Sequence, residues 1–550
     1  MAVAVIRKRT CESPMSRPPV RILPTAIAAF CTAFVAAALF INPGLVDSPL
    51  PDGPGLTTDE SFNILQGIYL AQALEQHGPL LFTPAVAQQV FRTPDFLPDH
   101  PPLARLLIGI AHESTAWLIP GAEAAVCNVA AARLASCFTF ALTAALLTGF
   151  ALRRWGSATA FAAAALLIGS PQLIGHARLA ALETTVNFTW TLALLPLLAH
   201  WTSHAPPRNK QAALAGICFG LLLLTKVQAI LLPPVVVGWT LLRFRHRGIR
   251  PLLIWGLTAG LLFFAAWPWL WEDPLQRTLQ YLGRTTNRTI LYCWYLGERW
   301  VDREVPWHYP LVILLCSLPI ATAIGLLLRC RTRQFAPDEQ LLLAASLFPL
   351  IVFAVPGVPV YDGNRLFLIC FPGLILLAAR GWAASLAGHS ANSLQPRITT
   401  ISTGLALVLL PLPWTMQPFA LNQYSLLCGG NYGASALGLE AGYWGDALNA
   451  QFWRQIPENS TLLVAPVSHQ FQLSSLETMV PLISQKKIHL KPWLYEDSRE
   501  PLPCRLLLIH RLADLRPELA QPRPERPEIL SIRCSGTPLA RLVEVLPAPN

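Results

Sequence analysis

The chain has 550 residues, of which 53% are hydrophobic and 13% are charged, and its formal net charge is +10. A soluble domain is typically about 25% charged, and here the apolar residues gather in long runs, which argues against a soluble globular protein. The runs are rich in Leu and Ala and lack the alternation of an outer-membrane barrel, so they predict spanning helices of roughly 20 residues each. Most Arg and Lys residues lie at the ends of the runs, which is typical of topology signals rather than of a nucleic-acid-binding surface.

The first predicted span, Ile22–Ile41, follows a basic N-terminal segment that places the N-terminus inside. A signal peptide is the alternative, but the run is long for its apolar region and no small-residue cleavage site is evident. The loop Asn42–Val126 comes next and is expected to face outward. Within it, the run Leu103–Ile119 contains His112 and Glu113, so it is expected to lie at the membrane interface rather than to span.

Ten further spans are expected: Asn128–Leu152, Ser157–Ile174, Thr184–Trp201, two within Gln211–Leu242, Leu252–Leu270, Leu311–Leu328, Leu341–Val355, Leu366–Ala379 and Ile398–Met416. Gln211–Leu242 is long for one helix and short for two. Two short spans that turn near Lys226 place every Arg cluster between spans inside, whereas a single span moves the last three clusters outside. The positive-inside rule therefore predicts eleven spans and an outward C-terminus.

The outward segments in this topology are residues 42–126, 175–183 and 271–309, the turn at Lys226 and the loop 356–364. The domains expected are a transmembrane domain, 1–416, and an outward C-terminal domain, 417–550. The second is richer in Pro and charge and is predicted to be a small α/β domain. Its strands are expected at Thr461–Ala465, Ile488–Leu490, Arg505–Ile509 and Leu542–Leu546, and its helix at Ser474–Ile483, with Ser474 as N-cap.

The twelve cysteines show no CxxC pair and no metal-ligand spacing. Those within apolar runs are expected to act as small hydrophobic residues. In the tail, Cys504 and Cys534 could form a disulfide if the compartment is oxidising, and two free thiols agree equally well with the sequence.

Asp59 and Glu60 are adjacent acids shortly after the first span. Adjacent acids near a membrane surface can activate an acceptor hydroxyl as a general base, and they can also bind a metal ion. The alternative is structural, because Thr57 or Thr58 could cap a helix that carries both acids in its first turn.

Asp99-His100-Pro101-Pro102 directly precedes the predicted Leu103 helix. The two prolines fix the backbone and present Asp99 and His100 rigidly at the helix start. The positive end of that helix could hold a phosphate group, although the motif by itself is also compatible with a simple helix entry.

Further ionisable residues map to the outward face. Glu183 and Arg178 share a short loop, and Lys226 interrupts an apolar stretch, where a charge is costly unless it has a function or reaches the headgroups. Arg365 follows Asp362 and is expected to have an anionic partner, either that acid or a lipid phosphate. Acids and cations on one face suit an enzyme for an anionic lipid-linked substrate, because cations hold the phosphate and a carboxylate activates the nucleophile.

With the eleven predicted spans, the Asp59-Glu60 and Asp99-His100-Pro101-Pro102-Leu103 motifs resemble the group of protein O-mannosyltransferases and aminoarabinose transferases. These are C-type glycosyltransferases that use polyprenyl-phosphate sugars. Five further motifs resemble a bacterial branch of the group: Trp267-Pro268-Trp269-Leu270-Trp271-Glu272-Asp273-Pro274, Tyr295-Leu296-Gly297, Pro306-Trp307-His308-Tyr309-Pro310, Asn364-Arg365-Leu366-Phe367 and Gly442-Tyr443-Trp444-Gly445-Asp446-Ala447-Leu448. The similarity covers residues 57–448.

The resemblance implies that Asp59 is the catalytic general base, with Glu60 as its neighbour in the catalytic pair. The resemblance and the shared outward face together imply a set of residues that bind the donor phosphate and the substrate. These are Asp99, His100, Arg178, Glu183, Lys226 and Arg365. Glu183 stands where the family commonly has Asp, which keeps the charge but lengthens the reach. The implied reaction is inverting: an acceptor attacks the anomeric carbon and polyprenyl phosphate departs.

The resemblance also implies partners and a location. The donor is a polyprenyl-phosphate-linked sugar, and the acceptor is a lipid, a glycan or a protein. No cofactor is expected, with a divalent cation left open. The location expected is the inner (plasma) membrane, multi-pass, with the N-terminus cytoplasmic and the C-terminal domain periplasmic.

Two other classes compete with a glycosyltransferase. A transporter or lipid flippase predicts paired halves, interrupted helices and a midplane site, whereas this sequence shows no such symmetry and places its ionisable residues at one face. A membrane scaffold whose tail binds a partner leaves the acidic and basic positions unexplained.

Overall fold

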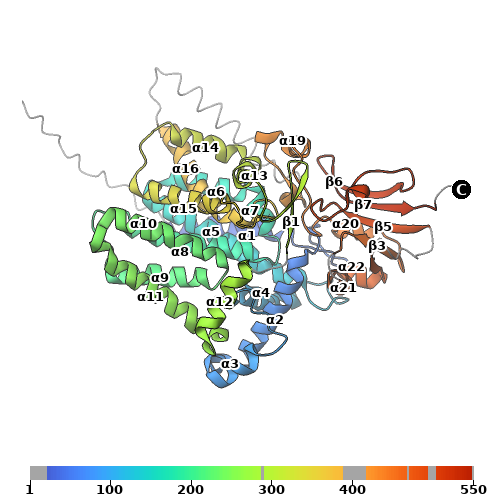
Figure 1. Cartoon of the computed structure of the whole chain (residues 1–550), viewed down its shortest axis with the longest axis horizontal. Helices are drawn as coiled ribbons and strands as arrows, with labels where there is room; N and C mark the ends of the chain where they lie inside the picture. Colours follow the sequence, from blue (N-terminus) through green and yellow to red (C-terminus); the bar gives the residue numbers. More distant parts are fainter. Residues whose placement is uncertain (1–21, 287–289, 388–416, 468–469, 494–502, 548–550) are drawn as a thin grey trace, which may run out of the picture.

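The structure is a computed structural model that describes residues 22–286, 290–387, 417–467, 470–493 and 503–547. A bundle of helices forms one end of the molecule and a small sheet forms the other, with α2 and α4 near the boundary between them (Figure 1). The helices of the first part are α1 (Ile22–Ala38), α2 (Thr58–His77), α3 (Pro84–Phe91), α4 (Pro102–Thr115), α5 (Val129–Trp155), α6 (Ser157–Ile168), α7 (Pro171–His176), α8 (Leu182–His200), α9 (Asn209–Leu223), α10 (Leu232–Phe244), α11 (Ile249–Ala266), α12 (Pro274–Thr286), α13 (Tyr309–Ser317), α14 (Ile320–Cys330), α15 (Pro337–Phe353) and α16 (Phe371–Ala387).

Three helical stretches of the described chain are long and apolar enough to cross a membrane: Val129–Trp155, Val227–Ala266 and Arg365–Leu386. A fourth is possible if α13 and α14, which meet at an angle of 109°, form one broken span. Three more apolar helices, α1, α6 and α9, are shorter. The prediction of eleven spans is therefore not confirmed, and its last span, Ile398–Met416, lies outside the described residues.

Prolines account for several of the shortened helices. The predicted spans Ser157–Ile174 and Leu311–Leu328 are each interrupted, before Pro171 and at Pro319, because proline cannot donate the hydrogen bond that continues a helix. The predicted interruption at Lys226 is present, since α9 ends at Leu223 and a 3-10 turn begins at Val227.

One face of α11 carries exposed leucines at helical spacing. Leu253, Leu257 and Leu261 have exposed fractions of 60%, 66% and 69%. Residues four apart lie on the same side of a helix, so these side chains form a continuous apolar stripe. Such a stripe is unfavourable in water and suits contact with lipid chains, which agrees with a membrane protein.

The C-terminal unit is built around a five-stranded sheet in the order β4-β3-β5-β7-β6. β3 is parallel to both β4 and β5, whereas β7 is antiparallel to β5 and β6. The strands are β3 (Thr461–Ala465), β4 (His489–Pro492), β5 (Cys504–Ile509), β6 (Glu528–Cys534) and β7 (Thr537–Val545). The helices are α19 (Gly430–Ala436), α20 (Ala450–Arg454), α21 (Gln470–Met479), α22 (Pro481–Lys486) and α23 (Pro517–Ala520).

This unit confirms the predicted α/β domain with two corrections. The sequence did not predict β6, and the predicted helix Ser474–Ile483 is two helices that break before Pro481, so Ser474 lies inside α21 and is not an N-cap. Cys504 and Cys534 do not form a disulfide. Cys504 is paired with Val545 and Cys534 with Thr537, at the two ends of β7. At about 3.3 Å per residue, the distance between these ends is far beyond the reach of a disulfide.

The C-terminal unit packs directly on the loop between the first two long helices of the bundle. Arg454 of α20 forms an ion pair with Asp52 at 2.7 Å. The rings of Phe62 on α2 and Phe471 on α21 lie 4.5 Å apart. The contact fixes the start of α2 between the bundle and the sheet.

The helices α2 and α4 cross in backbone contact at two glycines. A Cβ atom added to Gly109 would overlap the carbonyl oxygen of Gly67, and one added to Gly67 would overlap the carbonyl of Arg105. Any side chain at either position would push the helices apart. This crossing therefore sets how the first turn of α2 lies against the residues that precede α4.

We expect Gly109→Ala to destabilise the protein by about 1–3 kcal/mol, because overpacking at a close crossing forces backbone shifts. Gly256→Ala on α11 is the matched control, since nothing lies within 4 Å of the added Cβ there. Thermal unfolding of the purified proteins in detergent measures the difference. Equal midpoints for the two variants would contradict the crossing.

Candidate active site

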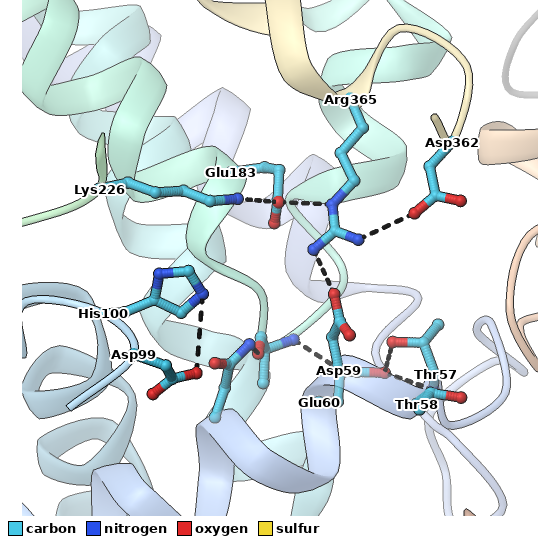
Figure 2. Close-up of polar contacts among 12 residues, drawn as sticks. Thr57, Thr58, Asp59, Glu60, Asp99, His100, Glu183, Lys226, Asp362 and Arg365 are labelled. Atoms are coloured by element: carbon cyan, nitrogen blue, oxygen red, sulfur yellow. Dashed lines mark hydrogen bonds and ion pairs between the residues drawn. The ribbon is translucent and has the colours of Figure 1, made fainter. Parts of the chain in front are cut away.

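The guanidinium group of Arg365 is the centre of an ionic cluster. Its Nε lies 2.7 Å from Oε1 of Glu183 and its Nη1 lies 3.1 Å from Oδ2 of Asp362. Its Nη2 contacts Oδ2 of Asp59. Lys226 completes the cluster, with Nζ 2.6 Å from the same Glu183 oxygen. Figure 2 shows these side chains pointing toward one another from separate segments.

Four members of the cluster stand where a helix or 3-10 turn begins, and Asp362 lies in the loop before Arg365. Asp59 and Glu183 lie in the first turns of α2 and α8, where acids are favoured by the helix dipole. Lys226 is the N-cap of the 3-10 turn Val227–Leu231, and Arg365 begins the 3-10 turn Arg365–Cys370. Four elements that are distant in sequence therefore converge at one end of the bundle.

The cluster is buried except at Asp59. The side chains of Glu183 and Lys226 are 2% and 8% exposed, whereas that of Asp59 is 45% exposed. Buried charges persist only when they are paired, so Glu183 holds Lys226 and Arg365 in place. Asp59 is the member whose carboxylate can meet a molecule that approaches from solvent.

Asp99 and His100 lie beside this cluster, with His100 next to Lys226 (Figure 2). Arg105 binds Asp99 with both terminal nitrogens, at 2.5 and 2.9 Å. Burial alone would raise the pKa of Asp99, but His100 and Arg105 lower it below the ordinary value. Loss of hydration lowers the pKa of His100, so its ring is neutral at pH 7 and can offer a hydrogen bond rather than a charge.

Glu60 does not share the exposure of Asp59, although the two are adjacent. Its side chain is fully buried and paired with Arg133, with Nε and Nη2 of the arginine each 2.8 Å from a carboxylate oxygen. The backbone N–H groups of Thr57 and Ala180 donate to the same carboxylate at 2.9 and 2.7 Å. The structure does not support the predicted catalytic role, because no oxygen of Glu60 is open to substrate.

The expected alternative role, a helix start, is what these contacts show. Thr57 is the N-cap of α2, and the contact between its backbone N–H and Glu60 is half of a capping box. Arg133 links α5 to this turn and also donates to the carbonyls of Pro54 and Gly55. Through these contacts, Glu60 fixes the position of the helix turn that carries Asp59.

We expect Glu60→Ala to cost about 3–5 kcal/mol of stability, because it leaves the buried Arg133 charge without its partner. Glu75→Ala is the matched control, since Glu75 lies on the same helix and is exposed. Thermal or denaturant unfolding in detergent checks the difference. A loss of activity in Glu60→Ala at unchanged stability would contradict a purely structural role.

Arg178 is a second predicted site residue, after Glu60, that the structure does not bring to the cluster. Its side chain is fully buried and faces α1, where it donates to the carbonyl of Ala36 at 3.1 Å and lies over the ring of Phe40. It also contacts Gln417. Its contacts connect the loop before α8 to the first helix, so the prediction of a phosphate ligand is not supported.

The C-terminal unit contributes to the site through Arg511. Its Nη2 lies 2.5 Å from Oδ1 of Asp362, the acid that also pairs with Arg365. Arg511 contacts Glu440 as well, and the N–H of Ala513 donates to Glu440 at 3.0 Å. Sequence reasoning missed Arg511 and Glu440, because neither stands in a recognisable motif and only the docking of the domain brings them near Arg365.

The predicted motif Gly442–Leu448 supports the segment before α2. The backbone N–H of Gly55 donates to the carbonyl of Asp446 at 2.7 Å. Gly445 has a positive φ of 78° and a Cβ there would overlap the carbonyl oxygen of Leu56, so glycine is required. Burial raises the pKa of the Asp446 side chain to about 7, despite hydrogen bonds that favour the charged form.

This pKa predicts a pH dependence of stability. Between its ordinary value of 3.8 and about 7, folded Asp446 keeps a proton that the unfolded chain has lost. Stability therefore falls as the pH rises through this window, by about 1.4 kcal/mol per pH unit from this group. Asp446→Asn should flatten the change in unfolding temperature between pH 5 and 7.5. The exposed Asp95→Asn is the control, and an unchanged slope in Asp446→Asn would contradict the assignment.

Among the described residues, no group of three or more His, Cys, Asp or Glu side chains is arranged to hold a metal ion. The acids at the centre of the site are instead paired with Arg365 and Lys226.

Residues 85–275 match the family of dolichyl-phosphate-mannose-protein mannosyltransferases. The resemblance to this group of C-type glycosyltransferases is confirmed over these residues. The matched segment contains Asp99, His100, Glu183 and Lys226 and ends before Arg365. A comparison with curated protein sequences gives no match.

Solved structures show distant likenesses. Two crystal structures of ArnT from Cupriavidus metallidurans, in the apo state and bound to undecaprenyl phosphate, align with 95% of this chain and 97% of theirs. Their identities are 15% and 14% and their TM-scores 0.47 and 0.48. The archaeal oligosaccharyltransferase AglB from Archaeoglobus fulgidus, in complex with an inhibitory peptide and a dolichol-phosphate, aligns with 84% of this chain and 63% of its own at 13% identity and a TM-score of 0.44.

Proposed function

We propose that this chain is a membrane glycosyltransferase that moves a sugar from a polyprenyl-phosphate donor to an acceptor hydroxyl, with Asp59 as the general base. The observation that carries the proposal is the half-exposed Asp59 carboxylate in contact with Arg365, which shares Glu183 with a second cation, Lys226. The family match over residues 85–275 supports the same class of reaction.

The cations suit the leaving group of this reaction. When the bond between sugar and phosphate breaks, negative charge develops on the phosphate oxygen, and fixed cations in a buried site stabilise that charge. Lys226 and Arg365 share one oxygen of Glu183, so both nitrogens already point at a single position. A donor phosphate takes its place beside them, and neutral His100 adds a hydrogen bond.

Asp59 suits the acceptor side of the reaction. Its Oδ2 contacts Arg365, while the side chain remains 45% exposed. Asp59 takes the proton of the acceptor hydroxyl as that oxygen forms a bond to the anomeric carbon. The bond from that carbon to the phosphate oxygen breaks, and polyprenyl phosphate leaves with the electron pair. Attack opposite the leaving group inverts the anomeric carbon.

The proposed location is the inner (plasma) membrane, with the site and the C-terminal unit on the periplasmic face. The cluster lies at the end of the bundle that contacts the C-terminal unit, since Arg511 reaches Asp362 there. Clusters of Arg such as Arg243, Arg245 and Arg247 stand at other helix ends, in agreement with the positive-inside rule.

We expect Asp59→Asn to lower the rate of sugar transfer by about 10²–10⁴-fold, because the amide cannot accept the acceptor proton. The measurement is transfer of radiolabelled sugar in membranes supplied with a polyprenyl-phosphate sugar. Glu75→Gln, an exposed position on the same helix, is the control. Undiminished transfer by Asp59→Asn in a preparation where the wild type is active would reject the general-base role.

A further inference from the structure

A polar cavity lies against the ionic cluster, between the helical bundle and the C-terminal unit. Its walls come from α7, the strand β1 (Tyr292–Tyr295), α13 and the segments around residues 363, 424 and 441, with Arg511 at one side. Asp362 lines the cavity and also pairs with Arg365. The Asp362 side chain therefore connects the cavity to the proposed phosphate site.

Among the described residues, three buried polar atoms of this wall have no hydrogen-bond partner, and one of them, Nε of Arg511, has an ion-pair contact with Asp514 at 3.6 Å. The other two have no such contact with a described residue. They are Nε2 of His176 and Nδ2 of Asn364, on side chains whose residues are only 2% and 4% exposed. Nδ1 of His176 lies 2.8 Å from the carbonyl oxygen of Gln172. A carbonyl only accepts, so Nδ1 carries the hydrogen and Nε2 of the neutral ring is an acceptor. The wall thus offers one acceptor and one donor.

We propose that this cavity binds the sugar ring of the donor, and that His176 and Asn364 recognise its hydroxyl groups. The inference rests on the proposed function and names the part of the substrate that the cavity takes. A hydroxyl both donates and accepts, so a polyol can satisfy the two atoms together. A buried polar atom without a partner is costly, which makes such a site selective for ligands that supply one.

The rest of the wall fits a sugar as well. Tyr309, Tyr424, Tyr443 and Trp294 give it aromatic surface, and ligand cavities typically combine such surface with a few placed polar groups. The ring of Tyr443 contacts that of His176 edge to face, with centroids 5.9 Å apart. A sugar is joined to its phosphate by one oxygen, so a phosphate at Arg365 and Lys226 leaves the sugar in reach of this cavity.

The test compares a lipid phosphate with and without a sugar. The full-length protein in detergent is titrated by calorimetry with neryl phosphate, and with neryl phosphate esters of a panel of hexoses and pentoses. In the wild type, at least one sugar is expected to lower the Kd by about tenfold or more relative to neryl phosphate alone. Lys226→Ala should weaken every ligand, including neryl phosphate itself.

The variants isolate the two atoms. His176→Asn keeps a donor for the carbonyl of Gln172 but lacks Nε2, and Asn364→Leu keeps the volume but lacks the amide. In each variant, the sugar is expected to lower the Kd by no more than about threefold relative to neryl phosphate, while the Kd of neryl phosphate itself stays the same. Ser317→Ala is the matched control, because Ser317 lines the same cavity but its hydroxyl donates to Ile313 of its own helix at 2.7 Å.

The outcomes separate the two proposals. A full sugar gain in both variants, or no gain with any sugar while neryl phosphate binds, would overturn the sugar site and leave the proposed function standing. Failure of neryl phosphate to bind the wild type would instead count against the proposed function. Thermal unfolding at the wild-type midpoint shows that each variant is folded. A changed Kd of the sugar-bearing ligand in Ser317→Ala would refute the specific roles of the two atoms.

Discussion

The organisation of this protein depends on one guanidinium group, that of Arg365, shared by three carboxylates. Glu183 and Asp362 hold it from the bundle side and the loop side, and Asp59 meets it from α2. A buried charge that loses a partner is strongly destabilising. The starts of α2 and α8 and the loop before Arg365 are therefore held together by the same interaction that creates the proposed site.

A second ion pair, between Glu60 and Arg133, determines how Asp59 is presented. Consecutive residues of a helix point about 100° apart, so one acid of the pair can face the protein while the other faces out. Glu60 faces inward and receives Arg133 and two backbone N–H groups. The rigidity of this turn leaves Asp59 with a fixed direction, which is what a group that removes a proton in a defined geometry requires.

The C-terminal unit is a structural part of the site. Arg511 extends the chain of ion pairs from Arg365 through Asp362 to Glu440, and the segment around Asp446 supports the residues before α2. The proposed sugar cavity is closed partly by residues of this unit, Tyr443 and Arg511 among them. The unit thus contributes to the position of the proposed catalytic groups and to the proposed sugar cavity.

The sequence determined the class of protein, the position of most helices, the α/β nature of the tail and the motifs that contain Asp59, Lys226 and Arg365, because hydrophobic runs, prolines and isolated charges are local signals. It did not determine which of two adjacent acids is exposed, nor that Arg178 faces α1, since burial depends on the packing of distant helices. Nor could it place Arg511 or the unpartnered atoms of His176 and Asn364. The ion pairs of Arg511 and the cavity beside it exist only once the C-terminal unit has docked on the bundle, and that docking is decided by the tertiary structure.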